Sequence, residues 1–112
     1  SVYDPALASS PDFALQQKYT PNGLCGVLSF ELKGSKETAM KWLNALKLVS
    51  REVHVADIRT CALHPATSTH RQLSSEDLKA ANISETLIRL SVGIETLEDI
   101  LADLTQAFEQ AV

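Results

Sequence analysis

The chain has 112 residues, of which 45% are hydrophobic and 21% charged, and its formal net charge is -4. This length suits one domain with a modest hydrophobic core, and this composition is typical of a soluble globular protein rather than a disordered one. The ten Lys and Arg residues form no basic run, which argues against nucleic acid as a partner. No apolar stretch is long enough to cross a membrane.

The cysteines and the N-terminus indicate a compartment. Cys25 and Cys61 each stand alone within an apolar run, which predicts two buried, reduced thiols and no cysteine-based metal site. The first residues have neither the charge nor the apolar segment of a signal peptide. Together these features favour the cytoplasm.

Residues 1–9 have no periodic pattern and are expected to form a connecting arm, so that the domain itself covers residues 10–112. Ser10 and Pro11 favour a helix start, since serine caps free N–H groups and proline tolerates the first helical position. The first half of the domain is predicted to contain a helix at 11–19, an alternating strand at 26–33, an amphipathic helix at 36–48 and short strands at 51–56 and 59–63.

The second half begins with a loop from His64 to about Leu73. Ser74 and Asp77 resemble a capping box for a short helix, with Leu73 and Leu78 placed as a hydrophobic staple. Residues 86–92 alternate well enough to predict a strand. A last helix follows Gly93, and its buried face is expected to consist of residues at helical spacing: Leu97, Ile100, Leu101, Leu104, Ala107, Phe108 and Ala111.

These elements predict an α+β fold, a small and mostly antiparallel sheet with short hairpin segments and with helices packed on one face. Arg89 lies in the middle of its predicted strand and points away from the face that carries Ile88 and Leu90. It therefore faces water or a partner, and a guanidinium matches a carboxylate in two-pronged geometry. Spacing alone favours the simpler alternative, an exposed arginine paired with an acid such as Glu31.

The loop from His64 to His70 concentrates hydroxyls and imidazoles, and loops held on a sheet often carry sites. Two histidines without a third ligand are weak evidence for a metal, so no metal site is predicted. No Gly-x-Ser-x-Gly elbow or glycine-rich phosphate loop is present. The six lysines fall on polar surfaces, where none is expected to form a Schiff base.

Several segments resemble the C-terminal small domain of the Cys/Met metabolism enzymes that depend on pyridoxal phosphate (PLP, fold type I). The segment 64–70, His-Pro-Ala-Thr-Ser-Thr-His, is similar to the family's His-Pro-Ala-Ser-x-Thr-His signature. Residues 88–95 are similar to its carboxylate-binding strand, 26–34 to an earlier strand and 98–104 to its last helix. Lys18-Tyr19 with Pro21 and Gly23, and Arg71-Gln72-Leu73, most resemble O-acetylhomoserine sulfhydrylases.

The resemblance implies an enzyme of methionine and cysteine biosynthesis. Its reaction would transfer an aminocarboxypropyl unit from activated homoserine to sulfide or a thiol, with PLP as an electron sink. Arg89 would bind the substrate α-carboxylate, and Thr69 would line the substrate pocket. His54 stands where the family usually places a small polar residue, Ser or Asn, that helps to bind the same carboxylate, so substrate preference is left open.

The resemblance also implies what lies elsewhere. The family's Schiff-base lysine, phosphate loop and ring-stacking aromatic belong to a large domain, so this chain alone is expected to bind no cofactor and to be inactive. Its partners would be that large domain, sister subunits of a homotetramer and a small amino-acid substrate. The same residues also suit a cystathionine γ-synthase or γ-lyase. A stand-alone binding or regulatory module is a further alternative, although the start at Ser1 favours a fragment.

Overall fold

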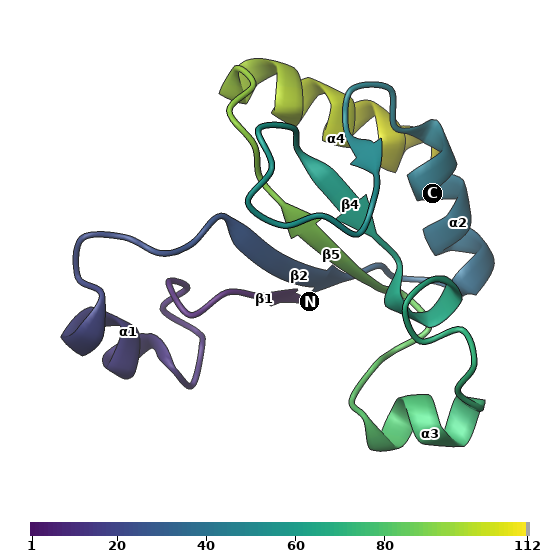
Figure 1. Cartoon of the computed structure of the whole chain (residues 1–112), viewed down its shortest axis with the longest axis horizontal. Coiled ribbons are helices and arrows are strands. Elements are labelled where there is room, and N and C mark those ends of the chain that lie inside the picture. The colour runs from purple at the N-terminus through teal and green to yellow at the C-terminus, as the bar shows by residue number, and fades with distance from the viewer. Residues whose placement is uncertain (112) are drawn as a thin grey trace.

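The computed structural model describes residues 1–111 and shows a five-stranded sheet with two long helices on one face (Figure 1). The strand order is β1-β2-β5-β4-β3, and every neighbouring pair is antiparallel except β3 and β4. This confirms the predicted α+β class. The strands are β1 (Val2–Tyr3), β2 (Val27–Glu31), β3 (Ser50–Arg51), β4 (Cys61–Leu63) and β5 (Leu87–Ser91).

Helices occupy only part of the segments between and after the strands. They are α1 (Phe13–Tyr19), α2 (Lys36–Ala45), the 3₁₀ helix η1 (Pro65–Thr67), α3 (Ser75–Ala80) and α4 (Leu97–Ala111). No helix among the described residues is long and apolar enough to span a membrane.

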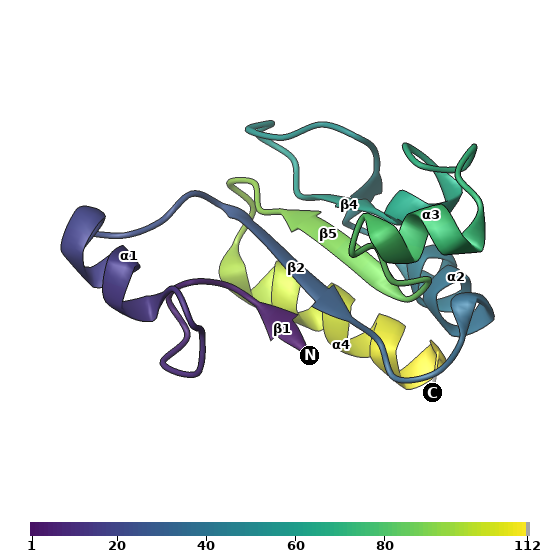
Figure 2. The same ribbon diagram turned by 90° about the horizontal axis from the view of Figure 1, so that it is seen from below.

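The two faces of the sheet have different surroundings. In Figure 2, α2 and α4 lie on one side of the sheet, while the loop after β3 and helix α3 lie on the other. The core fills the helix side, where Phe30, Ile88 and Leu90 of the strands pack with Trp42 and Ala107 of the helices. Because side chains alternate along a strand, Arg89 emerges on the opposite, open face, as predicted.

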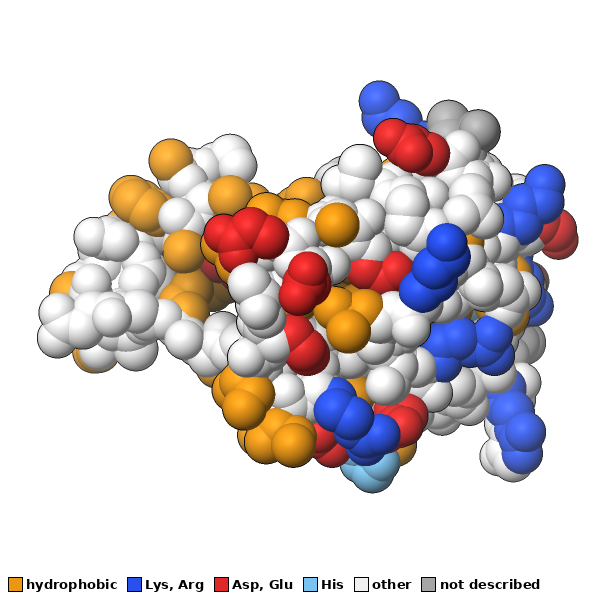
Figure 3. Space-filling model, turned by 90° about the horizontal axis from the view of Figure 1, so that it is seen from above, with side chains coloured by type: hydrophobic (Ala, Val, Ile, Leu, Met, Phe, Trp, Pro, Cys, Tyr) orange, Lys and Arg blue, Asp and Glu red, His pale blue; other side chains and the backbone are white. Residues whose placement is uncertain are grey.

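Charged side chains of both signs occur on the face drawn in Figure 3. Figure 3 shows one face on which acidic and basic groups lie among each other, while hydrophobic side chains gather on the side that carries the N-terminal segment. This distribution agrees with the absence of a basic run in the sequence. The segment with α1 projects from the edge of the sheet (Figure 1).

Several sequence expectations need correction at the start of the chain. Residues 1–9 are predicted as an arm only, yet Val2 and Tyr3 pair with Phe30 and Ser29 to form an edge strand. Cys25 is exposed, whereas Cys61 is buried as expected, because Cys25 lies in the segment that leads from α1 to the sheet.

The end of α2 comes earlier than periodicity predicts. Asp103 of α4 accepts hydrogen bonds of 2.9 Å from the backbone N–H groups of Lys47, Leu48 and Val49. These three donors are therefore drawn toward a carboxylate rather than toward carbonyls of their own helix. The chain leaves the helix at Leu46, which has extended backbone angles, instead of continuing to Leu48.

The two short strands predicted at 51–56 and 59–63 are also shorter in the structure, and they do not form a hairpin. β3 and β4 run parallel, with Ser50 opposite Cys61 and Arg51 opposite Ala62. The N–H of Thr60 bonds to the Glu95 carboxylate rather than to a strand, so β4 begins only at Cys61. Residues 52–60 instead form a loop over the open face (Figure 2).

The last helix buries a narrower face than expected. Ile100 and Ala107 are buried, but Leu97, Leu101 and Phe108 are exposed. Asp103 occupies part of the buried face instead and is only 6% exposed. Earlier in the chain, Ser74 and Asp77 do form the predicted capping box of α3.

Replacement of Asp103 by asparagine should lower stability in a pH-dependent way. Burial raises the pKa of the Asp103 carboxyl, but the N–H groups of Val49, Lys47 and Leu48 and the Gln106 amide outweigh it, so the pKa lies below its usual value. A lowered folded-state pKa stabilises the fold above the unfolded pKa of about 4, and this stability is lost as the pH falls through the folded value. We expect Asp103→Asn to cost about 2–4 kcal/mol at pH 7.

Urea unfolding at several pH values checks this expectation. The difference in unfolding free energy between the native chain and Asp103→Asn should shrink below about pH 4. The exposed Glu109 on the same helix is the matched control, and Glu109→Gln should change stability by less than about 0.5 kcal/mol. A gap between the two chains that does not depend on pH would contradict the proposed role of the carboxylate.

Gly93, which follows β5, is predicted to tolerate no side chain. A Cβ atom there would overlap the Ile58 carbonyl oxygen and lie 2.5 Å from the Arg59 carbonyl carbon and 2.6 Å from the Thr60 nitrogen. We expect Gly93→Ala to cost about 1–3 kcal/mol or more, because backbone rather than a flexible side chain must move. The neighbouring Ile94 is 81% exposed, so Ile94→Ala in the same unfolding assay should be close to neutral.

Candidate functional site

Arg89 is the centre of the candidate site on the open face. It lies in the middle of β5, between Ser29 of β2 and Leu63 of β4. Its Nη2 donates a hydrogen bond of 2.6 Å to the carbonyl oxygen of Val53. Its Nε is sealed from solvent and has no acceptor among the described residues. The guanidinium is thus held in place with only part of its donor capacity used.

The suggested ion pair between Arg89 and Glu31 does not form. Glu31 accepts a hydrogen bond of 2.8 Å from the Tyr3 hydroxyl, which raises the pKa of Tyr3. Among the described residues, no acidic side chain forms an ion pair with Arg89. The sequence-based alternative of a charge neutralised by its neighbour is therefore wrong for this arginine.

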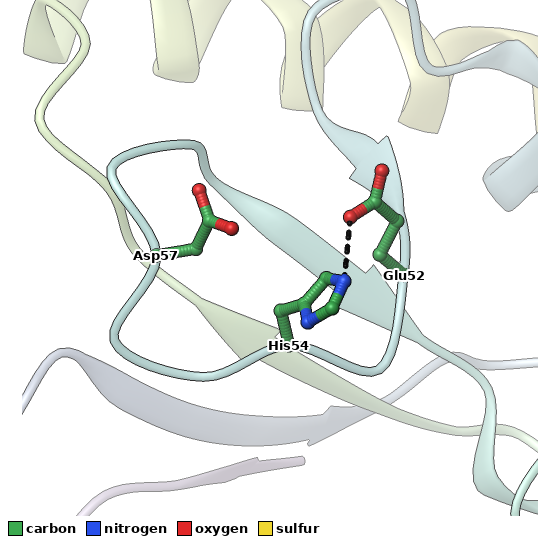
Figure 4. Close-up of side chains that lie close together, drawn as sticks. All are labelled: Glu52, His54 and Asp57. Atoms are coloured by element: carbon green, nitrogen blue, oxygen red, sulfur yellow. Dashed lines mark ion pairs between the residues drawn. The ribbon is translucent and has the colours of Figure 1, made fainter.

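The partner of Arg89 comes from the loop between β3 and β4. This loop, which we call the strap (residues 52–59), carries Glu52, His54 and Asp57 close together (Figure 4). Arg59 closes it by donating to both oxygens of Glu52, at 3.1 and 2.9 Å. The Arg59 guanidinium and backbone N–H also bond to Asp57 and lower the pKa of that carboxyl.

His54 is on the strap, but its ring pairs with Glu52 rather than with Arg89. The ring Nε2 lies 3.2 Å from a Glu52 carboxylate oxygen, and more than half of the side chain is exposed (Figure 4). The structure therefore brings the backbone of Val53 to Arg89, whereas the sequence pointed to the side chain of the following residue. Nothing in the sequence signals a carbonyl partner, since every residue has a carbonyl.

The predicted pocket threonine lies outside this constellation. Thr69 is exposed and its hydroxyl lies 2.8 Å from Nδ1 of His70. His64, at the start of the same segment, is buried: its ring nitrogens lie 2.8 Å from the Thr67 hydroxyl and 2.7 Å from the Glu85 carbonyl oxygen. In the chain as described, this segment ties η1 to the entrance of β5, and His64 has a structural role.

The same open face continues from Arg89 into a groove of about 640 Å³. Ser29, Glu31 and Leu87 form its floor, and Tyr3 and Lys79 are among the residues that flank it. Ser29 is the cross-strand neighbour of Arg89, so the groove lies on the same face of the sheet. Arg89 itself is not among the residues that line it.

The strap cluster is better described as an ion-pair network than as a metal centre. Possible ligand atoms of Glu52, His54 and Asp57 lie within 4.8 Å of one another. However, Arg59 already forms ion pairs with both carboxylates, and only one imidazole is present. We derive no metal chemistry from it, and the sequence-based prediction of no metal site stays a prediction.

The described residues do not provide a fit for a PLP cofactor. All six lysines are exposed, at positions 18, 33, 36, 41, 47 and 79. A Schiff-base lysine needs a desolvated or otherwise perturbed environment, which these positions lack. What this chain offers is a positioned guanidinium suited to a carboxylate, together with a groove on the same face of the sheet.

Comparison with known proteins places the chain in a family. The family described as Cys/Met metabolism PLP-dependent enzyme matches residues 1–109. A homocysteine synthase of Schizosaccharomyces pombe is 44% identical over 107 residues, which cover 96% of this chain and 25% of that protein.

Two solved structures share the fold as well as the sequence. One is a Campylobacter jejuni protein assigned as an O-acetylhomoserine (thiol)-lyase, which carries a pyridoxyl-lysine group. It is 41% identical with a TM-score of 0.86, over 96% of this chain and 26% of its own. The other is the cystathionine gamma synthase of Xanthomonas oryzae, 34% identical with a TM-score of 0.89, over 99% of this chain and 28% of its own.

The chain spans about a quarter of the length of the curated relatives that it matches. The matched range, residues 1–109, includes β5 and the strap. The chain belongs to the family of PLP-dependent enzymes of Cys/Met metabolism.

Proposed function

We propose that this chain is the substrate-carboxylate-binding part of an O-acetylhomoserine sulfhydrylase-like enzyme. The whole enzyme would transfer an aminocarboxypropyl unit from acetylated or similarly activated homoserine to sulfide or a thiol. The observation that supports this most directly is Arg89, an arginine fixed on a central strand with an unpaired buried Nε. A bidentate guanidinium is the group best matched to an amino-acid carboxylate.

The choice among family members rests on the relatives. Proteins named O-acetyl-L-homoserine sulfhydrylase from Thermus thermophilus and homocysteine synthase from S. pombe are both 44% identical to this chain. A cystathionine gamma synthase shares the fold with a TM-score of 0.89, so that activity is the second candidate. Both reactions start from an activated homoserine and differ in the sulfur compound that accepts the four-carbon unit.

The proposal assigns the remaining parts of the enzyme to other regions. Residues 10–112 would form the C-terminal small domain, and residues 1–9, which include the edge strand β1, would lead to it from a large domain with the Schiff-base lysine and the phosphate site. The complete enzyme would be a cytoplasmic homotetramer without nucleic-acid or membrane partners. The chain alone would bind no cofactor and have no activity, and the alternative of a stand-alone module would require it to act without that domain.

Within the proposed site, the roles of the chain's own residues follow from geometry. Arg89 would hold the substrate carboxylate and so fix the orientation of the reacting carbons. His54 would lie near the same carboxylate only after its ring turns from Glu52, and Thr69 would need a neighbouring element to enclose it. These two residues are therefore secondary in the proposal, and Arg89 is primary.

The acceptor can be identified with the full-length enzyme. We expect O-acetyl-L-homoserine with sulfide to give homocysteine, at a kcat/KM at least tenfold above that for the same donor with L-cysteine. Product analysis by mass spectrometry distinguishes homocysteine from cystathionine. Preferred formation of cystathionine would favour the second candidate, and formation of neither would overturn the proposed reaction.

Arg89→Ala in the full-length enzyme is expected to lower kcat/KM by about 10- to 100-fold, because a charge-assisted pair to the substrate carboxylate is lost. The absorbance spectrum of the bound cofactor should not change, since Arg89 would touch substrate only. Arg71→Ala is the matched control, because Arg71 is exposed and lies on the loop before α3. Unchanged kinetics for Arg89→Ala would remove this residue from the site.

A further inference from the structure

The Arg89 guanidinium already binds a neutral hydrogen-bond acceptor from its own chain. Its Nη2 donates to the Val53 carbonyl oxygen at 2.6 Å, while the adjacent Nε has no acceptor among residues 1–111. A carboxylate that pairs in two-pronged fashion with Nε and Nη2 must reach Nε, which is sealed from solvent, and bond to Nη2, where Val53 is already bound. Carboxylate and strap therefore compete for access to this part of the guanidinium.

We propose that the tip of the strap, residues 53–56, is a displaceable cap on Arg89, and that a ligand carboxylate binds by replacing the Val53 carbonyl. This inference rests on the proposed carboxylate-binding function of Arg89 and adds to it a moving part. It also gives the strap a role in selecting ligands, because any ligand must compete with a carbonyl that is already bound.

The tip of the strap is built so that it can move. The side chains of Val53 and Val55 are each 53% exposed and His54 is more exposed than buried, so little apolar packing is lost if the tip swings away. Ala56 has a φ of 56°, in the left-handed region that a residue with a Cβ atom seldom adopts. The closed conformation of the tip thus carries local backbone strain.

The base of the strap is firm by contrast. Arg59 bonds to Glu52 on the opposite side of the loop and to Asp57 beside it. Thr60, next in the chain, donates its N–H to Glu95. A loop with a fixed base and an unpacked tip pivots as a unit, so the displacement should stay within residues 53–56.

The competition favours anions over neutral ligands. A carboxylate forms charge-assisted hydrogen bonds, which are roughly twice as strong as those of a neutral carbonyl. It can also satisfy Nε, which the Val53 carbonyl leaves without an acceptor. A neutral amide offers one carbonyl oxygen in exchange for another and gains nothing by displacing the strap.

A single isotope-labelling experiment can follow the cap. Val53-His54 is the only Val-His pair in the sequence, so the chain labelled with ¹³C-carbonyl valine and ¹⁵N histidine gives one correlated NMR signal from that peptide bond. We titrate this chain with acetate, and with acetamide as a neutral molecule of the same shape, at constant ionic strength. Arginine Nε signals, recorded in parallel on a chain labelled with ¹⁵N arginine, report on Arg89. Its signal is the one that Arg89→Ala lacks.

We expect acetate to cause a saturable upfield shift of the Val53 carbonyl carbon together with a shift of the Arg89 Nε signal, and acetamide to cause neither. In Arg89→Ala the Val53 signal should already lie upfield and not respond, whereas Arg71→Ala should respond like the native chain. If Arg89→Ala does not fold, the contrast between acetate and acetamide in the native chain still shows whether a carboxylate displaces the strap.

Two outcomes would overturn the proposal in different ways. If acetate shifts the Arg89 Nε signal but leaves Val53 in place, the strap is not displaced, while the carboxylate-binding function stands. If acetate shifts neither signal, Arg89 binds no carboxylate, and both the cap and the proposed function of this residue fail.

Discussion

Gly93 lies against the backbone of residues 58–60 at a distance that leaves no space for a Cβ atom. Around this contact, the N–H of Gly93 donates to the Thr60 hydroxyl and the N–H of Ile94 donates to the Ile58 carbonyl. The turn between β5 and α4 is thereby joined to the base of the strap. The strand that carries Arg89, the helix that covers the core and the loop that caps the site all meet at this glycine.

Acidic side chains do much of the internal organisation of the chain. Asp103 accepts three backbone N–H groups at the end of α2, and Glu95 accepts the N–H of Thr60. Glu52 and Asp57 are held by Arg59. A net charge of -4 therefore does not indicate a surface for a basic partner, since these acids are engaged within the fold. Arg89, in contrast to Arg59, has no carboxylate partner among the described residues, because its Nη2 donates to a neutral carbonyl.

The sequence predicted those features of the fold that depend on short-range periodicity, namely strands and the faces on which their side chains lie. Alternation located β5 and placed Arg89 on the face opposite Ile88 and Leu90, and the structure confirms both. Long-range hydrogen bonds determined where α2 ends and which group binds Arg89, and alternation could predict neither. Asp103 is separated by more than fifty residues from the N–H groups that it binds, and its capture of them ended α2 early. The partner of Arg89 was missed for a related reason, because a backbone carbonyl leaves no mark in the sequence.

The proposed division of the enzyme into a carboxylate-binding part and a cofactor-binding part has a physical basis. Holding a carboxylate requires only a guanidinium on a rigid strand, and a small sheet backed by two helices is sufficient for that. Holding PLP requires a perturbed lysine and a phosphate site, and the exposed lysines of this chain provide neither. A carboxylate site that functions apart from its cofactor would bind many anions. The proposed cap would weaken the binding of such anions, because displacing the strap costs free energy. For the substrate, the contacts of a second domain with the rest of the molecule would offset that cost.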